Sequence, residues 1–157
     1  MSRDPEYADL LGRTLPPLTY EVEKGQIRFY TRTLGEVDLI HFDEAAAQAA
    51  GYRSIVAPPT FAFSALRGSA EQMPIVDALG WGDDQLGRCL HGEQTFRYGA
   101  PICAGDVLTI TEGLERIYQK RGGALTFFVT RTRMFNQLAE EVVQMSMTLI
   151  LQARANG

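Results

Sequence analysis

The C-terminal half of the chain contains four consecutive segments with the composition of β-strands, and this succession constrains the fold most. The segments are rich in β-branched and aromatic residues, and short polar turns separate them. They cover residues 89–98, 106–119, 124–135 and 140–151. In the last segment apolar and polar side chains alternate, with Val143, Met145, Met147, Leu149 and Leu151 on one side and Gln144, Ser146 and Thr148 on the other. This alternation predicts an antiparallel sheet with one buried face.

The first half of the chain predicts one strand among helices. Asp43 is placed to cap a helix over the EAAAQAA stretch, and Gly51 stands where a left-handed helix stop belongs. The other expected elements are a short helix over residues 5–12, a strand over 18–23, a helix from Lys24 to about Leu34 that ends near Gly35, an irregular segment over 35–43, and a loop or short helical turn over 74–88.

A tandem proline, Pro58-Pro59, precedes the most apolar helix. Proline excludes helix at Ala57 and Pro58, so the helix begins after them, with Thr60 as its N-cap or a first-turn residue. About three helical turns follow, with Phe61, Phe63, Ala65, Leu66 and Ala70 on them. A helix this apolar must be buried by other secondary-structure elements that pack around it. We therefore expect an α+β fold, one domain over residues 1–157, in which the antiparallel sheet wraps around this helix.

Composition limits the class of protein. The net charge is −4 and the pI about 5.2, which argues against nucleic acid or an anionic membrane as the main partner. No signal peptide and no apolar run long enough for a membrane span are recognised, and the two cysteines, Cys89 and Cys103, lack metal-ligand spacing. We expect a cytoplasmic protein with reduced cysteines and no bound metal.

Two stretches carry a family resemblance. They are GEVDLIHFDEAAAQAAGYRSIVAPPTFAF and FRYGAPICAGDVLTI. Both resemble the MaoC-like dehydratases and (R)-specific enoyl-CoA hydratases, and the APPTF sequence is most similar to the N-terminal half of double-hot-dog dehydratases. The resemblance spans roughly residues 20–151. It implies a single hot-dog fold, a site at a dimer interface, acyl groups carried by coenzyme A or acyl carrier protein, and no cofactor.

The resemblance also implies site residues. The family's catalytic histidine falls on His41, and the aspartate five positions earlier falls on Glu36. The motif's asparagine and proline fall on Asp38 and Leu39. Asp43 continues the motif, although a helix cap is its expected role. Asp38 is a second candidate for the carboxylate.

The family's thioester-binding His-Gly pair falls on Pro58-Pro59. Proline has no N–H, so Pro59 cannot donate a hydrogen bond to the thioester carbonyl. Thr60 is the nearest replacement, through its N–H or its hydroxyl, at a helix N-terminus. The residues expected to contact substrate are Asp38, Ala57, Pro58, Thr60 and Phe61.

Three functions remain open from the sequence. The first is hydration of 2-enoyl thioesters and dehydration of 3-hydroxyacyl thioesters, in which a carboxylate and an imidazole hold one water. The second is a non-catalytic hot-dog subunit that shapes the acyl pocket of a catalytic partner, in a heterodimer rather than a homodimer. The third is an acyl-CoA thioesterase with Glu71 as its carboxylate.

His91 and the basic residues near the Gly122-Gly123 turn each have a structural and a functional interpretation. His91 is expected to share a strand face with Glu93 and Arg97 and to point away from the central helix if Phe96 and Tyr98 pack on it. The basic residues near the Gly122-Gly123 turn are a surface hairpin tip, with contacts to carrier phosphates as the alternative; they are Arg116, Lys120 and Arg121.

Overall fold

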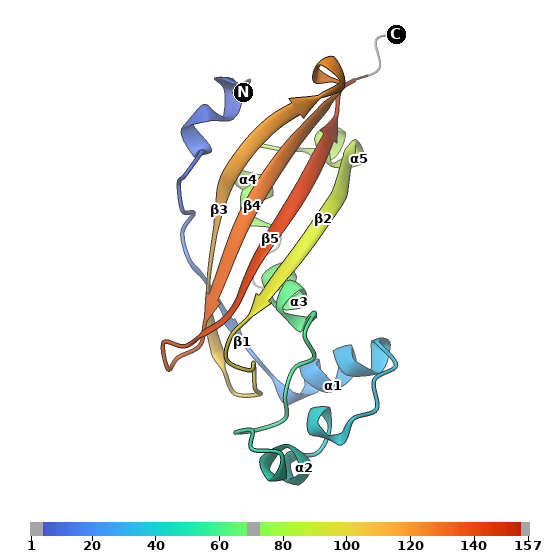
Figure 1. The fold of residues 1–157 in the computed structure, drawn as a ribbon, viewed down its shortest axis with the longest axis vertical. Helices are drawn as coiled ribbons and strands as arrows, with labels where there is room; N and C mark the ends of the chain where they lie inside the picture. Colours follow the sequence, from blue (N-terminus) through green and yellow to red (C-terminus); the bar gives the residue numbers. More distant parts are fainter. Residues whose placement is uncertain (1–4, 69–72, 155–157) are drawn as a thin grey trace.

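The computed structural model describes residues 5–68 and 73–154 (Figure 1). Within them, one antiparallel sheet has the strand order β1-β3-β4-β5-β2. The strands are β1 (Leu18–Glu21), β2 (Cys89–Tyr98), β3 (Val107–Lys120), β4 (Leu125–Phe135) and β5 (Glu141–Gln152). The four C-terminal strands match the expected ranges to within one residue at either end, because their alternating pattern is itself the signal for a half-buried strand.

One face of the sheet is buried. The buried apolar side chains on it include Leu108, Ile110, Leu114, Phe128, Met134, Val143, Met145, Met147 and Leu149. The long strands bend along their length, and α3 and α4 lie on the same side of them (Figure 1). This arrangement confirms the expected α+β architecture with a helix against the inner face of a curved antiparallel sheet.

Three of the helices before the central one lie beyond one end of the sheet (Figure 1). They are α1 (Lys24–Thr33), η2 (Leu39–His41, a 3₁₀ helix) and α2 (Glu44–Ala49). The first helix, η1 (Pro5–Leu10, also 3₁₀), lies near the other end, where Tyr7 packs edge-on against Phe128 of β4. The Asp43 carboxylate accepts a hydrogen bond from the Ala46 N–H at 2.8 Å, which confirms its role as the cap of α2. Gly51 has a φ of 91°, the left-handed conformation expected at a helix stop.

The central helix α3 (Phe61–Gly68) begins one residue after the tandem proline, and helix after the prolines was expected. Phe61 packs edge-on against the rings of Tyr20 and Tyr30, which joins α3 to β1 and α1. The predicted third turn includes Ala70, which lies outside the described residues. Downstream, two short helices, α4 (Pro74–Ala78) and α5 (Asp83–Gly87), occupy the segment expected to be a loop or a single turn.

Strand β2 contains an irregularity that reverses one expectation. His91 pairs with Leu149, whereas Glu93 pairs with Thr148, so Gly92 is an extra residue in the ladder. His91 therefore lies on the inner face with Phe96, and its ring contacts Phe63 of α3 at 5.5 Å. The prediction that His91 points away from the central helix is wrong. A Cβ on Gly92 would lie 2.5 Å from Ile150 Cδ1, which explains glycine at the bulge.

Candidate functional site

The segment between α1 and α2 folds on hydrogen bonds from its own acidic side chains. The Glu36 carboxylate accepts the N–H of Val37 at 2.8 Å and that of Asp38 at 3.1 Å. The Asp38 carboxylate in turn accepts the N–H of Ile40 at 3.1 Å and caps η2. Both carboxylates are exposed. The acidic residues thus shape the loop that carries His41 at its end.

His41 is the buried member of this loop, with 8% of its surface exposed. Its Nδ1 lies 2.6 Å from the backbone oxygen of Val56, and the Val56 N–H donates to the Ile40 oxygen at 3.0 Å. A carbonyl only accepts hydrogen bonds, so Nδ1 carries the proton, and Nε2 of the neutral ring carries the lone pair. The imidazole therefore has a fixed orientation and tautomer.

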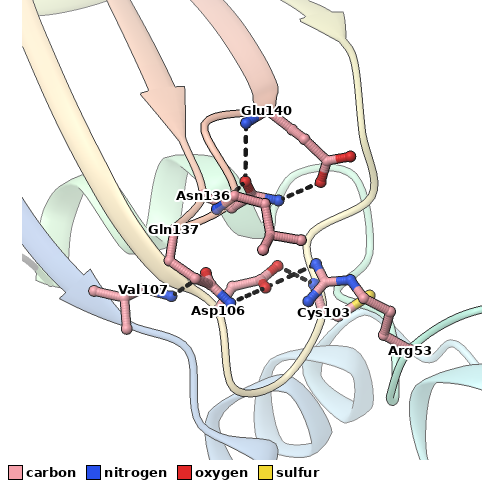
Figure 2. A network of polar contacts seen from close by, with 8 residues as sticks. Arg53, Cys103, Asp106, Val107, Asn136, Gln137 and Glu140 are labelled. Atoms are coloured by element: carbon pink, nitrogen blue, oxygen red, sulfur yellow. Dashed lines mark hydrogen bonds and ion pairs between the residues drawn. The ribbon is translucent and has the colours of Figure 1, made fainter.

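The buried carboxylate of Asp106 lies at the centre of a polar network (Figure 2). Asp106 has no exposed surface; it accepts the Cys103 N–H at 2.8 Å and the Arg53 guanidinium at 2.8 Å. The Gln137 amide also donates to Asp106, at 3.3 Å, and accepts the Val107 N–H at 3.0 Å. The network joins the loop after α2, the turn before β3 and the β4–β5 hairpin.

This network reaches the histidine through backbone pairing. Val56 forms an antiparallel bridge with Cys103, and the Ala57 N–H donates to the Ile102 oxygen at 2.8 Å. The Val56 carbonyl is therefore held in place by the same turn that Asp106 holds. Burial raises the pKa of the Cys103 thiol, so this cysteine stays protonated and is a structural residue.

The start of α3 contributes the remaining predicted residues. Ala57 and Pro58 are buried, while Pro59 and Thr60 are exposed. The Tyr30 hydroxyl donates to the Thr60 hydroxyl oxygen at 3.0 Å. Within residues 5–68 and 73–154, the Thr60 N–H has no acceptor. Thr60 therefore presents a backbone donor and a hydroxyl hydrogen beside the proline that cannot donate.

Phe61 lies below this surface, fully within the core. Its N–H donates to the Pro58 oxygen at 2.9 Å, and its ring packs on two tyrosines. The structure thus places Glu36, Asp38, His41 and Thr60 at the surface or just beneath it. A contact of Phe61 with substrate remains a prediction.

The Glu36 carboxylate is electrostatically linked to His41. The N–H groups of Asp38 and Val37 hold the pKa of Glu36 below its usual range, and the positive form of His41 contributes in the same direction. Glu36 is therefore ionised at neutral pH. An ionised carboxylate is a hydrogen-bond acceptor, and so is the Nε2 of His41 whenever its ring is in the neutral form.

The basic residues of the β3–β4 hairpin pack on aromatic rings of the outer face. The guanidinium of Arg116 lies 5.1 Å from the Tyr118 ring centre, and the Lys120 ammonium lies 4.9 Å from that of Phe127. These cation–π contacts explain the cluster as a folded hairpin tip. A phosphate-binding role for it remains a prediction.

Sequence reasoning missed one titratable residue. Glu112 points inward from the middle of β3 with 2% of its surface exposed, and burial raises its pKa to about 7. The signal was present, since Glu112 occupies an inward position in an alternating strand. Glu71, the carboxylate of the thioesterase hypothesis, lies outside the described residues.

Residues 5–68 and 73–154 contain no group of three or more His, Cys, Asp or Glu side chains arranged to hold a metal ion. In the same ranges, no helix has the length and apolar character required to cross a bilayer.

Comparison with known proteins gives the family. The family described as FAS1-like, dehydratase domain region, matches residues 9–145. The chain belongs to this family. A UPF0336 protein of Streptomyces avermitilis is 34% identical over 148 residues, which are 94% of this chain and 95% of that protein. The resemblance to dehydratases seen in the motifs is thereby confirmed.

Solved structures of dehydratases and of a hydratase share the fold. One is the C-terminally truncated HadBC complex, a 3R-hydroxyacyl-ACP dehydratase of Mycobacterium tuberculosis, with 26% identity, a TM-score of 0.76, and coverage of 91% of this chain and 98% of that one. A MaoC-like dehydratase has 26% identity and a TM-score of 0.78 over 94% of this chain and 43% of its own. The R-hydratase PhaJ1 of Pseudomonas aeruginosa, at 18% identity and a TM-score of 0.68 over 96% of this chain and 91% of its own, supports the hot-dog fold alone.

Proposed function

We propose that this chain hydrates 2-enoyl thioesters and dehydrates 3-hydroxyacyl thioesters, with coenzyme A as the acyl carrier, at a site shared between two hot-dog chains. The observation that carries the proposal is the bond from His41 Nδ1 to the Val56 oxygen. It fixes a buried imidazole whose Nε2 has no partner among the described residues, in the loop that also holds Glu36. Membership of a dehydratase family supports the reaction class.

The chemistry follows from two acceptors beside one water. The ionised Glu36 and the His41 Nε2 each accept one hydrogen of the water, which turns an oxygen lone pair toward C3 of the enoyl group. In hydration the C3–O bond forms as the C2–C3 π electrons shift toward the thioester carbonyl and one of the two acceptors takes a proton from the water. That acceptor then gives the proton to C2, which returns the acceptor to its starting state. Dehydration reverses these steps.

The thioester carbonyl needs donors as negative charge develops on its oxygen. Thr60 supplies two, because its N–H lacks an acceptor among the described residues and its hydroxyl oxygen already accepts from Tyr30. The hydroxyl hydrogen of Thr60 is then free to donate. These donors replace the one that Pro59 lacks.

Exposed apolar side chains around the loop support a second chain at the site. Phe29, Val37 and Leu39 are 71%, 81% and 62% exposed, and Leu34 is half exposed. We call these four the flanking apolar residues. They border Glu36 and His41 in sequence, and a partner would remove them from water.

The test follows hydration of crotonyl-CoA and of a long-chain enoyl-CoA by the loss of enoyl absorbance. We expect turnover by the purified chain, and we expect His41→Ala to abolish it while the fold is retained. His91→Ala is the control, because it removes the only other histidine. Activity that survives His41→Ala would contradict the proposal.

A second candidate is a non-catalytic subunit that needs a catalytic hot-dog partner. Two observations favour it: the Glu36 carboxylate is engaged by N–H groups of its own loop, and Pro59 occupies a donor position. The HadBC structure is itself described as a complex. Under this candidate the purified chain shows no turnover until a second hot-dog protein is added.

A further inference from the structure

A polar cluster lies on the otherwise apolar inner face of the sheet, away from the His41 loop. Its centre is Glu112, six residues along β3 from Asp106, which corresponds to about 20 Å of extended strand. One carboxylate oxygen of Glu112 accepts the Ile75 N–H of α4 at 3.1 Å, and the Thr132 hydroxyl bonds to the same carboxyl group. Apolar side chains, including Ile110 and Leu114, flank it on the strand.

Three polar atoms in this region are buried without a protein partner in the described parts of the chain. They are Oε1 of Glu112, Oγ1 of Thr130 and Nε1 of Trp81. Their residues are 2%, 0% and 4% exposed. Native proteins rarely leave such atoms unpaired, because each has lost its hydrogen bonds to water without replacement.

The register places Glu112 and Thr130 near one another on the inner face, and a ring contact places Trp81 beside the same strand. Thr132 is opposite Glu112 and Thr130 is opposite Leu114, so Thr130 is the diagonal neighbour of Glu112, about 7–8 Å away. Trp81 follows α4, and its ring stands edge-on to Phe128 at 4.9 Å between centroids. Phe128 precedes Thr130 by two residues and therefore shares its face of β4.

We propose that Glu112, Thr130 and Trp81 form a buried binding site for a hydroxyl group, enclosed between the sheet and α4. A hydroxyl suits the three atoms because it donates one hydrogen bond and accepts others. It donates to the Glu112 oxygen and accepts from the Trp81 indole N–H, while the Thr130 hydroxyl takes either role. An apolar group would leave all three atoms unpaired.

The surroundings favour a neutral ligand group. The cluster contains one acid, and burial already holds part of the Glu112 population in its protonated form near neutral pH. A charged group would have to leave water for an apolar interior, which is unfavourable without a full set of partners. Two sources of a hydroxyl are chemically equivalent here: an internal water, and the hydroxyl of a ligand with an apolar chain.

The chain has a single tryptophan, so its indole N–H gives one identifiable NMR signal. We expect a nuclear Overhauser effect between this proton and a long-lived water in the ligand-free protein. We expect Thr130→Val and Glu112→Gln each to weaken this effect and to shift the indole signal. Thr148→Val makes the same change on the opposite face of the sheet, at similar burial, and is expected to leave the signal unchanged.

Titration with 1-hexanol distinguishes the two sources. If the site takes a ligand hydroxyl, hexanol replaces the water effect with effects to its own methylene hydrogens, and hexane does not. If the water effect persists, the hydroxyl belongs to an internal water. The proposal is overturned if the indole proton shows neither effect, or if Thr130→Val and Thr148→Val act alike.

Discussion

Glu112 places a buried carboxyl group on the apolar inner face of the sheet. Burial raises its pKa to about 7, whereas a glutamate in an unfolded chain titrates near its model value of 4.5. The folded protein therefore binds this proton more tightly than the unfolded chain does. The resulting stabilisation is complete below about pH 4.5 and is lost as the pH rises to about 7.

Glu112→Gln should remove this pH dependence. The amide keeps an acceptor for the Ile75 N–H but cannot ionise, so the variant should gain up to about 3 kcal/mol over wild type between pH 4.5 and pH 8. Urea unfolding at several pH values measures the difference. The matched control is Glu115→Gln, whose parent carboxylate pairs with Arg131 on the exposed outer face. A pH-independent difference between wild type and Glu112→Gln would contradict the burial argument.

Glu36 tests the proposed chemistry at the same scale. Glu36→Gln removes a proton acceptor but keeps an oxygen for the N–H groups of Val37 and Asp38, so the loop should stay folded. We expect kcat for crotonyl-CoA hydration to fall by about 100-fold or more. Wild-type turnover in Glu36→Gln, together with loss in Asp38→Asn, would assign the carboxylate role to Asp38 instead.

The elements around His41 are joined by a single buried carboxylate. Asp106→Asn leaves the Arg53 guanidinium without its charged partner. It also places amide hydrogens next to the groups that donate to Asp106, such as the Cys103 N–H. We therefore expect the unfolding free energy to fall by about 3 kcal/mol. Chemical denaturation measures it. The exposed pair of Arg133 and Glu141 provides the control, since solvent screens this pair and Glu141→Gln should cost much less than Asp106→Asn. Equal losses of unfolding free energy in the two variants would show that Asp106 does not hold the elements around His41 together.

The elements differ in how far the sequence alone predicts them. Strands β4 and β5 follow from alternation along each segment, as does β3 as far as Leu114, after which Glu115 is an extra residue. The cap of α2 follows from Asp43 and Gly51. The face of His91 does not, because an extra residue in β2 is defined only by pairing with β5. For the same reason the motif locates His41, but its bond to Val56 depends on the pairing of Val56 with Cys103, far along the chain.

At the scale of the whole molecule, the flanking apolar residues predict an assembly of two chains. Val37→Glu combined with Leu39→Glu places charges where a partner should pack and should convert a dimer of 17.4 kDa chains into monomers. Sedimentation velocity measures the change. Leu138→Glu is the control, because Leu138 is similarly exposed on the β4–β5 hairpin. A wild-type chain that sediments as a monomer would contradict a homodimer and direct the search to a different hot-dog partner.

The bulge at Gly92 has a consequence for aligning relatives of this protein. His91, Gln94 and Phe96 share the inner face of the sheet only because one residue between His91 and Glu93 is left out of the alternation. A relative that lacks the residue at position 92 would present the same lining with a regular strand. Deletion of the residue at position 92 would therefore leave the same side chains on the inner face. Deletion of one residue elsewhere in β2 would move the side chains that follow to the opposite face of the sheet.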